Sequence, residues 1–282
     1  MAVAVARAGG SKVDWALETA QSRVTASLRG GLEQTLYQVV DPPSGVDGHE
    51  FSILRISGVG IPPQPSVDSL VFHIAAMQRK EGDWPNYGVV RPPLEDGGFS
   101  HTAKGIRVLQ LNLLPGRKAE FEERIARAAD WLKKASPRST EDRTMQLLGI
   151  RWAGQKPPED RVKQLIALQR PNGGWGQIGN LASDAYATGE ALYALHETGM
   201  AATHPVYSLG VDFLLRTQKG DGSWLVKTRA ASFQPYFESG FPHGHDQWIS
   251  QSGTAWAAIA LSYATRKGSS AAVTQASARA QP

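Results

Sequence analysis

The chain has 282 residues, no cysteine and a formal charge of +4 at pH 7. The absence of cysteine excludes disulfides and thiolate metal sites within this chain. Three of the positive charges, Arg266, Lys267 and Arg279, stand in a Ser/Ala/Gln-rich C-terminal stretch, so the rest of the chain is close to neutral. It has no basic stripe with interleaved aromatic residues, and nucleic acid is therefore not an expected partner.

Residues 1–10 form a short apolar run that ends in Gly-Gly. This run lacks the charged start, full apolar core and cleavage site of a signal peptide, and it is typical of the last turns of a helix. Residues 12–40 are amphipathic and predict a helix, which Asp-Pro-Pro at 41–43 ends. Residues 49–56 then predict a shorter helix that ends at Gly58 and Gly60.

From residue 67 onward two kinds of helical pattern alternate. The first kind is amphipathic, with apolar residues at i, i+3, i+4 and i+7, and predicts outer helices that bury one face. These segments are residues 67–78, 125–132, 162–169 and 206–214. The second kind is rich in small and apolar residues, which let helices pack closely, and predicts inner helices. These segments are residues 102–109, 140–152, 184–195 and 250–261, and three of them carry a Thr seven residues before a Leu, at Thr102, Thr188 and Thr254.

A Gln-x3-Gly-x-Trp motif occurs three times, each time four residues after an aliphatic residue at the end of an outer segment. The copies run from Gln78 to Trp84, from Gln169 to Trp175 and from Gln218 to Trp224. We interpret the motif as structural: the Gln bonds backbone groups at the helix end, the Gly supplies a left-handed cap, and the Trp anchors the turn. No copy follows Leu132, so other contacts are expected at that junction.

The motif resembles the QW motif of squalene-hopene cyclases, oxidosqualene cyclases and related prenyltransferase-fold proteins. Residues 184–195 (DAYATGEALYAL), 241–250 (FPHGHDQWIS) and 250–261 (SQSGTAWAAIAL) are similar to a bacterial branch of squalene-cyclase-like proteins. The resemblance covers nearly the whole chain and implies an all-α fold, an (α/α)6 toroid of two helical layers, over residues 1–266. The composition of residues 267–282 predicts a disordered tail.

In the resembling branch, a Cys-x-x-Cys-His segment often precedes the first helix. This chain starts after that point, so either a longer protein has been clipped or mis-started, or the segment has been lost. The uncharged stretch 247–265 is too polar to span a bilayer. The chain as given thus predicts a soluble protein without a signal peptide or transmembrane helix. The resemblance implies an apolar, isoprenoid-like ligand, which is compatible with peripheral membrane contact.

The loop before the last inner helix is the densest candidate for chemistry, since repeats of this kind place a cavity at the mouth of the toroid. Its aromatic rings could hold an apolar chain and stabilise a cation. Alternatively, they only pack as a lid. The residues expected to bind substrate are Tyr186, Tyr236, Phe237, Glu238, Phe241, His245 and Trp248.

Asp184 opens an inner segment near the place where the resembling cyclases set their acid. Burial would raise its pKa and make it a general acid toward an alkene, while its position equally suits a helix N-cap. The Asp-x-Asp-Asp acid motif of the cyclases is absent. We also expect Asp246, at another inner-helix start, to lie near Asp184, because parallel inner helices gather their starts at one end.

His243, His245 and Asp246 could be metal ligands or form a proton relay. Histidines that are solvated or bonded within the loop are the favoured interpretation, so neither a metal nor another cofactor is expected. Two functions follow. The first is an enzyme that binds an isoprenoid or similar apolar chain and isomerises or cyclises it by proton-initiated chemistry, with Asp184, Asp246 and His243 as catalytic candidates. The second is a non-catalytic toroid that binds a ligand or a protein.

Overall fold

A computed structural model of the protein describes residues 14–29, 50, 53, 54, 57, 65–86, 91–94, 97–231 and 236–264, with the backbone alone at 24–29 and 66. Within these residues the regular structure is helical, and the only extended pairing is an isolated bridge between Gly176 and Ser183. The predicted all-α class is therefore confirmed. None of the described helices is long and apolar enough to cross a bilayer.

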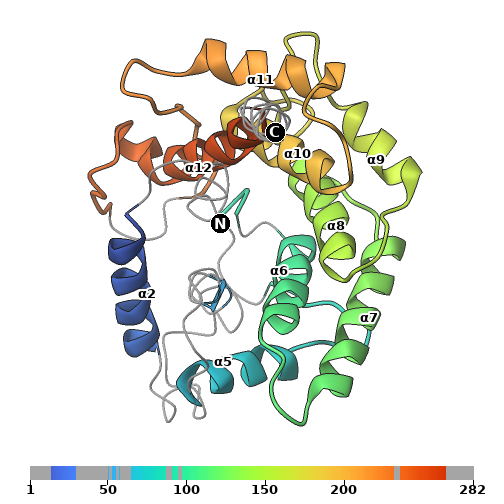
Figure 1. The fold of residues 1–282 in the computed structure, drawn as a ribbon. Coiled ribbons are helices and arrows are strands. Elements are labelled where there is room, and N and C mark those ends of the chain that lie inside the picture. The colour runs from blue at the N-terminus through green and yellow to red at the C-terminus, as the bar shows by residue number, and fades with distance from the viewer. Residues whose placement is uncertain are drawn as a thin grey trace, which may run out of the picture.

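Successive helices along the chain alternate between an outer and an inner position in the structure (Figure 1). In chain order they are α2 (Trp15–Arg29), α5 (Pro65–Ala76), α6 (Gly98–Leu111), α7 (Lys118–Lys134), α8 (Thr140–Trp152), α9 (Glu159–Ile166), α10 (Ala185–Glu197), α11 (Pro205–Thr217), the 3-10 turn η1 (Gly244–Asp246) and α12 (Gln247–Ala264). Of the predicted helix at residues 12–40, the part at 15–29 is confirmed and the part after residue 29 lies outside the described residues. At the predicted helix 49–56, the described residues 50, 53 and 54 are helical.

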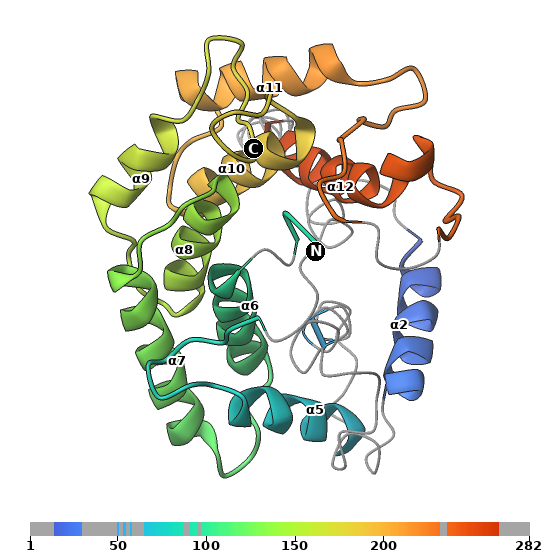
Figure 2. The same ribbon diagram turned by 180° about the vertical axis from the view of Figure 1, so that it is seen from behind.

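Two curved rows of helices result. Helices α6, α8, α10 and α12 form an inner row, and α5, α7, α9 and α11 run along its outside (Figures 1 and 2). Neighbours in the inner row pack on each other, with α8 in contact with both α6 and α10, and α10 in contact with α12. A Cβ atom at Gly189 on α10 would lie 2.5 Å from the backbone of Trp256 on α12, so these two helices touch through their backbones.

Burial follows the two sequence patterns. Every residue from Ala185 to Leu195 of α10 is buried, as expected for a helix enclosed on all sides. On α7 burial is confined to one stripe, Phe121, Ile125, Ala128, Ala129 and Leu132, while charged residues cover the rest. The distinction between inner and outer helices that the sequence predicted is therefore present in the structure.

The three Trp residues of the repeated motif occupy equivalent buried positions. Each indole N–H donates to the carbonyl of the aliphatic residue four places before the Gln, and each backbone N–H donates to the hydroxyl of the Thr that begins the repeated Thr-to-Leu spacing. The pairs are Trp84 with Ile74 (2.6 Å) and Thr102 (3.1 Å), Trp175 with Leu165 (2.8 Å) and Thr188 (2.9 Å), and Trp224 with Leu214 (2.8 Å) and Thr254 (3.1 Å). The Gln-x3-Gly-x-Trp motif and the Thr-to-Leu spacing therefore form the two sides of the same junction between an outer and an inner helix.

The Gly of the motif has a different role from the predicted cap. Helix α11 ends at Thr217 with Gln218 as its C-cap, whereas Gly222 lies beyond it in a turn closed by the Lys219 N–H and the Ser223 carbonyl. Gly82, Gly173 and Gly222 all have positive φ (106°, 85° and 85°). In each turn the Gln side chain donates to the carbonyl of the Gly four residues later, as Gln169 does to Gly173 at 2.9 Å. The left-handed Gly therefore shapes the turn and does not end the helix.

The junction after α7 lacks the motif and is held by other contacts, as predicted. Ser139 and Asp142 form a capping box at the start of α8. Gln146, buried on α8, donates to the carbonyls of Leu132 (2.5 Å) and Ala135 (3.1 Å) at the end of α7. A single side chain here satisfies the helix-end carbonyls that a Gln-Gly-Trp turn covers elsewhere.

Candidate functional site

The aromatic residues of the loop before α12 lie largely on the surface and so differ from the expected cavity wall. Tyr236, Phe237 and Trp248 are 49%, 66% and 49% exposed. Phe237 stacks on Trp248 with ring centroids 6.0 Å apart, and His245 packs on Tyr236 at 4.3 Å. We call these four residues the aromatic patch. The rings of the patch pack on one another. The buried side of α12 at this point is occupied by Ile249 and Ser250, so the patch stays at the surface.

Glu238 holds the loop in shape. Its carboxylate accepts hydrogen bonds from the Tyr236 hydroxyl (2.5 Å) and from the Gly240 N–H (3.1 Å), which lower the pKa of Glu238. The buried Gln247 side chain donates to the same Tyr236 hydroxyl at 2.5 Å. Glu238 is therefore an ionised acceptor that fixes the loop on the start of α12.

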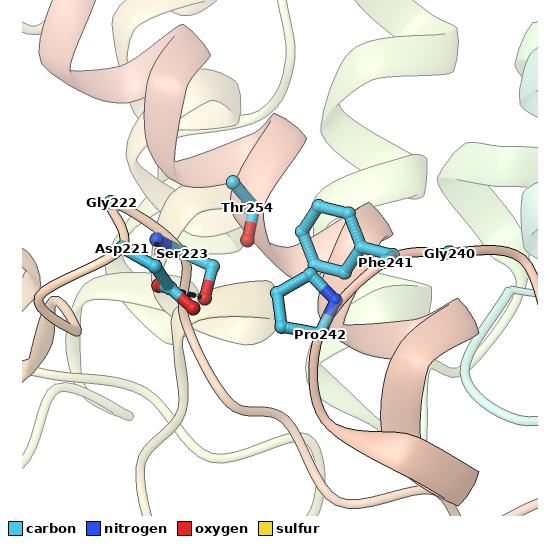
Figure 3. Close-up of a pocket in the computed structure, with 7 residues that line it drawn as sticks. All are labelled: Asp221, Gly222, Ser223, Gly240, Phe241, Pro242 and Thr254. Atoms are coloured by element: carbon cyan, nitrogen blue, oxygen red, sulfur yellow. Dashed lines mark hydrogen bonds between the residues drawn. The ribbon is translucent and has the colours of Figure 1, made fainter.

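A pocket of about 460 Å³ separates this loop from the third Gln-Gly-Trp turn. It is lined by Asp221, Gly222, Ser223, Gly240, Phe241, Pro242 and Thr254. Figure 3 shows the rings of Phe241 and Pro242 facing Ser223 and Thr254 across the opening. Of the expected substrate-binding residues, the structure places Phe241 here.

Ser223 and His243 meet beside the pocket with the geometry of a nucleophile and its base. The Ser223 Oγ lies 2.7 Å from the His243 Nε2 and 2.6 Å from the Asp221 Oδ1. Hydrogen bonds from Ser223 lower the pKa of Asp221, so its carboxylate is ionised and can only accept. The single hydroxyl proton of Ser223 therefore goes to Asp221, and His243 must donate to the serine. A hydrolytic serine needs the opposite order, so we interpret the trio as a turn-stabilising contact, with His243 held in a left-handed conformation (φ 89°).

Asp184 is the N-cap of α10. Its carboxylate accepts from the Ala187 N–H and from Gln177 Nε2, each at 2.9 Å, and Gln177 Oε1 accepts from Arg229 at 2.6 Å. Burial raises the pKa of Asp184, although these hydrogen bonds oppose the rise. Within the described residues no hydrogen bond joins Asp184 to residues 236–248. The contacts that the structure gives this carboxylate are those of a cap tied to the segment after α11.

Asp246 stands at the end of η1, one residue before α12. It accepts from Lys227 Nζ (2.7 Å) and from the Thr228 N–H (2.9 Å). Burial alone would raise its pKa, but these two donors outweigh burial and lower it. An ionised Asp246 can accept a proton or orient a cation, and it is a poor general acid. Like Asp184, which reaches Arg229 through Gln177, it links an inner-helix start to the irregular segment after Trp224.

A pair of buried carboxyl groups lies between the inner helices and was not anticipated from the sequence. Glu141 of α8 and Glu190 of α10 are 3% and 0% exposed. The Tyr186 hydroxyl, also buried, donates to Glu141 Oε2 at 2.9 Å. In the described part of the chain, the other Glu141 oxygen and both Glu190 oxygens have no hydrogen bond of standard geometry, although Ser100 and Thr144 lie close enough to interact with the pair. Tyr186, expected among the loop aromatics, thus belongs to this acid pair instead.

Both carboxyl groups are shifted toward the protonated form. Burial, and next the neighbouring Glu141, raise the pKa of Glu190 well above its usual range. Burial also raises the pKa of Glu141, while the charge of Lys104 on α6 opposes the rise. Two carboxylates at close range in a dry interior oppose each other's ionisation, which favours retention of a proton by the pair. The pair can therefore donate a proton to a bound group.

The internal repeat places Glu190 at the same helical position as two other residues of the inner row. Lys104, Glu190 and Trp256 each stand two residues after the Thr that bonds a motif Trp, so they occupy the same position on three inner helices. The Trp256 ring packs edge-on against Tyr186 at 6.5 Å and lies 5.6 Å from the Tyr193 ring. One turn before Lys104, the buried His101 faces Glu50 at 3.3 Å. The charged residues Lys104 and Glu190 thus lie in one row across the inner helices with Trp256, and Tyr186 and Tyr193 pack beside it.

A signal for Glu190 was available in the sequence: it is the one acidic residue in the otherwise apolar and small stretch 185–195. A charge at such a position is expensive to bury unless it is neutralised or used. Glu141 gave no such signal, because acidic residues are ordinary in the first turn of a helix.

No protein-family model matches the chain, and no curated protein matches it. In the described residues no group of three or more His, Asp or Glu side chains is placed to hold a metal ion.

Proposed function

We propose that the protein is a squalene-cyclase-like enzyme in which the Glu141–Glu190 pair supplies the proton for isomerisation or cyclisation of an isoprenoid or similar apolar chain. The observation that carries the proposal is a fully buried Glu190 carboxyl that lies beside Glu141 and whose pKa is raised well above its usual range. The two curved rows of helices and the three equivalent junctions support a complete (α/α)6 toroid, with the inner helices around a central binding site.

The chemistry needs one proton transfer. The Glu190 O–H bond breaks as the π electrons of a substrate double bond form a new C–H bond, which leaves a carbocation on the adjacent carbon and a carboxylate on Glu190. The nearby Lys104 stabilises that carboxylate. The Trp256 and Tyr193 rings offer π faces to the cation. Loss of a proton from the cation to the Glu190 carboxylate completes an isomerisation and restores the acid.

Deuterium incorporation tests this proposal. Lipids that copurify with the protein are first identified by mass spectrometry, and the same class of polyprenyl hydrocarbon is then incubated with the protein in D₂O. We expect a product that carries one deuterium on carbon. Glu190→Gln should abolish its formation, whereas Glu197→Gln, at the end of the same helix, should leave it unchanged. Equal turnover by the Glu190→Gln variant would remove this residue as the acid.

A second candidate function is a non-catalytic module that binds an apolar ligand, a protein or a membrane surface. The aromatic patch favours it, because exposed Tyr, Phe and Trp rings are typical of interaction surfaces and membrane interfaces. Retention of a lipid without deuterium incorporation would support the module. Loss of vesicle binding in a Phe237→Ala, Trp248→Ala variant would then identify the patch as the surface used.

A further inference from the structure

Among the described residues, the third Gln-Gly-Trp turn lacks a contact that the first two turns share. At the first turn, Gln78 Nε2 also donates to the Arg124 carbonyl on α7 at 2.8 Å. A Cβ atom at Gly82 would lie 2.5 Å from the carbonyl oxygen of Arg127, three residues later on the same helix. The turn is therefore pressed against the backbone of the outer helix that belongs to the next repeat.

The second turn is covered in the same way by α11. Gln169 Nε2 donates to the Val206 carbonyl at 2.8 Å, and a Cβ atom at Gly173 would lie 2.3 Å from the Leu209 carbonyl oxygen. Val206 and Leu209 are again three residues apart. Both turns thus use the Gln and the Gly to receive two carbonyls on one face of a helix.

At the third turn no described residue takes that place. Gln218 is exposed and, within the described residues, its Nε2 donates only to Gly222 of its own turn (2.9 Å). Among the same residues, a Cβ atom at Gly222 would meet nothing nearer than Gln218 itself at 4.0 Å. The residue after the aliphatic anchor is also uncovered. It is Ala75 in the first copy, 1% exposed, and Leu215 in the third, 55% exposed. The third turn therefore has the surface that binds an outer helix at the first two turns, but no described helix covers it.

Chain order identifies the segment that fits there. The helix over the first turn, α7, follows the next inner helix, α6, and the helix over the second turn, α11, follows α10. For the third turn the next inner helix is α12, which ends at Ala264. The segment in the equivalent place is residues 265–282.

The length and composition of this segment agree with that position. Arg124 follows the end of α6 by 13 residues and Val206 follows the end of α10 by 9 residues. Residues 273–277 are at the same spacing from Ala264. Alanine recurs at positions 271, 272, 276, 278 and 280, and it has the highest helix propensity and a side chain small enough for backbone contact. Such a short segment is a poor helix in isolation, which agrees with its disorder-like composition, and docking would supply the missing stability.

The charge of residues 265–282 also agrees with docking on the third turn. At the first turn Arg127 donates from its guanidinium to Gln78 Oε1 at 3.0 Å. Arg279 follows Ala276 by three residues, as Arg127 follows Arg124, and the exposed Asp221 stands beside Gly222. We propose that residues 265–282 dock as a helix on the third Gln-Gly-Trp turn, with the Ala276 carbonyl at Gln218 and Arg279 beside Gly222 and Asp221.

Because the chain has no cysteine, cross-linking of introduced pairs tests the docking directly in the full-length protein. Asp221→Cys with Arg279→Cys, treated with a short bis-maleimide, should give a cross-link within one molecule. The control pair, Asp221→Cys with Ala4→Cys, should give none. Absence of the first cross-link would overturn the proposal. A cross-link from position 4, or one between two molecules, would also overturn it by assigning the surface to the N-terminal segment or to a second copy.

Hydrogen exchange of full-length variants provides a second readout. Ala276→Pro should break the docked helix and speed amide exchange at residues 218–224 by roughly tenfold or more, while exchange at residues 169–175 stays unchanged. Gly222→Asn tolerates the left-handed backbone but fills the contact, and it should have the same effect without adding to that of Ala276→Pro. Unchanged exchange at residues 218–224 in the Ala276→Pro variant would contradict the docking.

Discussion

At the residue scale, the strongest structural anchors are the motif tryptophans. Trp175 is fully buried and its indole N–H satisfies the Leu165 carbonyl. We expect Trp175→Ala to lower the free energy of unfolding by about 3–5 kcal/mol, because it leaves a large cavity. Urea unfolding measures the change. Trp248→Ala removes a ring that is 49% exposed and should cost less than about 1 kcal/mol. A similarly small loss at Trp175 would show that the motif does not anchor the fold.

A substitution at Asp184 distinguishes its role as a helix cap from a role as the catalytic acid. Asp184→Asn keeps an acceptor for the Ala187 N–H but turns an N–H₂ group toward the Gln177 donor, so we expect a loss of about 0.5–1.5 kcal/mol, the value of one hydrogen bond. Turnover should persist if Glu190 is the acid. A folded Asp184→Asn variant without activity would instead make Asp184 the proton donor. Thermal unfolding and the deuterium assay are the two measurements.

At the scale of elements, the contact between a turn and the next outer helix can be isolated with two glycines. Gly173 and Gly199 both have positive φ, 85° and 104°, so Gly→Ala introduces comparable backbone strain at each. At Gly173 the new Cβ would also lie 2.3 Å from the Leu209 carbonyl oxygen, whereas at Gly199 no atom of the described residues lies within 4 Å. Gly173→Ala should therefore be more destabilising than Gly199→Ala by about 1–3 kcal/mol in chemical denaturation. Equal losses would mean that α11 does not press on this turn.

At the scale of the whole molecule, the acid pair makes stability depend on pH. The pKa of Glu190 is raised above that of the unfolded chain, so the folded state binds more protons than the unfolded state above about pH 4.5. The contribution is complete at low pH and is lost as the pH rises through the raised pKa. We therefore expect the free energy of unfolding to fall with increasing pH over this window, and urea titrations at several pH values measure it.

Glu190→Gln should flatten this dependence, because an amide has no proton to lose, and it should be relatively more stable than the original protein at the upper end of the window. Glu197→Gln on the same helix is the matched control and should keep the original slope. The same slope in the Glu190→Gln variant would mean that other groups, Glu141 foremost, carry the dependence.

The sequence by itself determined the helical class, the alternation of inner and outer helices and the positions of Trp84, Trp175 and Trp224. These features are repeated and local, since periodicity records which side of a helix is buried and a turn is specified within a few residues. The Thr to which each Trp bonds was visible as a second repeat, but its role was not, because the sequence does not say which side chains meet across a junction.

Only the tertiary structure decided the candidate site. Glu141 and Glu190 lie on different helices and become an acid pair because α8 and α10 pack side by side and exclude water from both. The loop aromatics Tyr236 and Phe237, which suggested a cavity wall, instead pack on His245 and Trp248, respectively, and face solvent. Burial and pairing are properties of the assembled molecule: the packing of the helices sets how close two carboxyl groups come and how dry they are, and these two quantities determine their pKa.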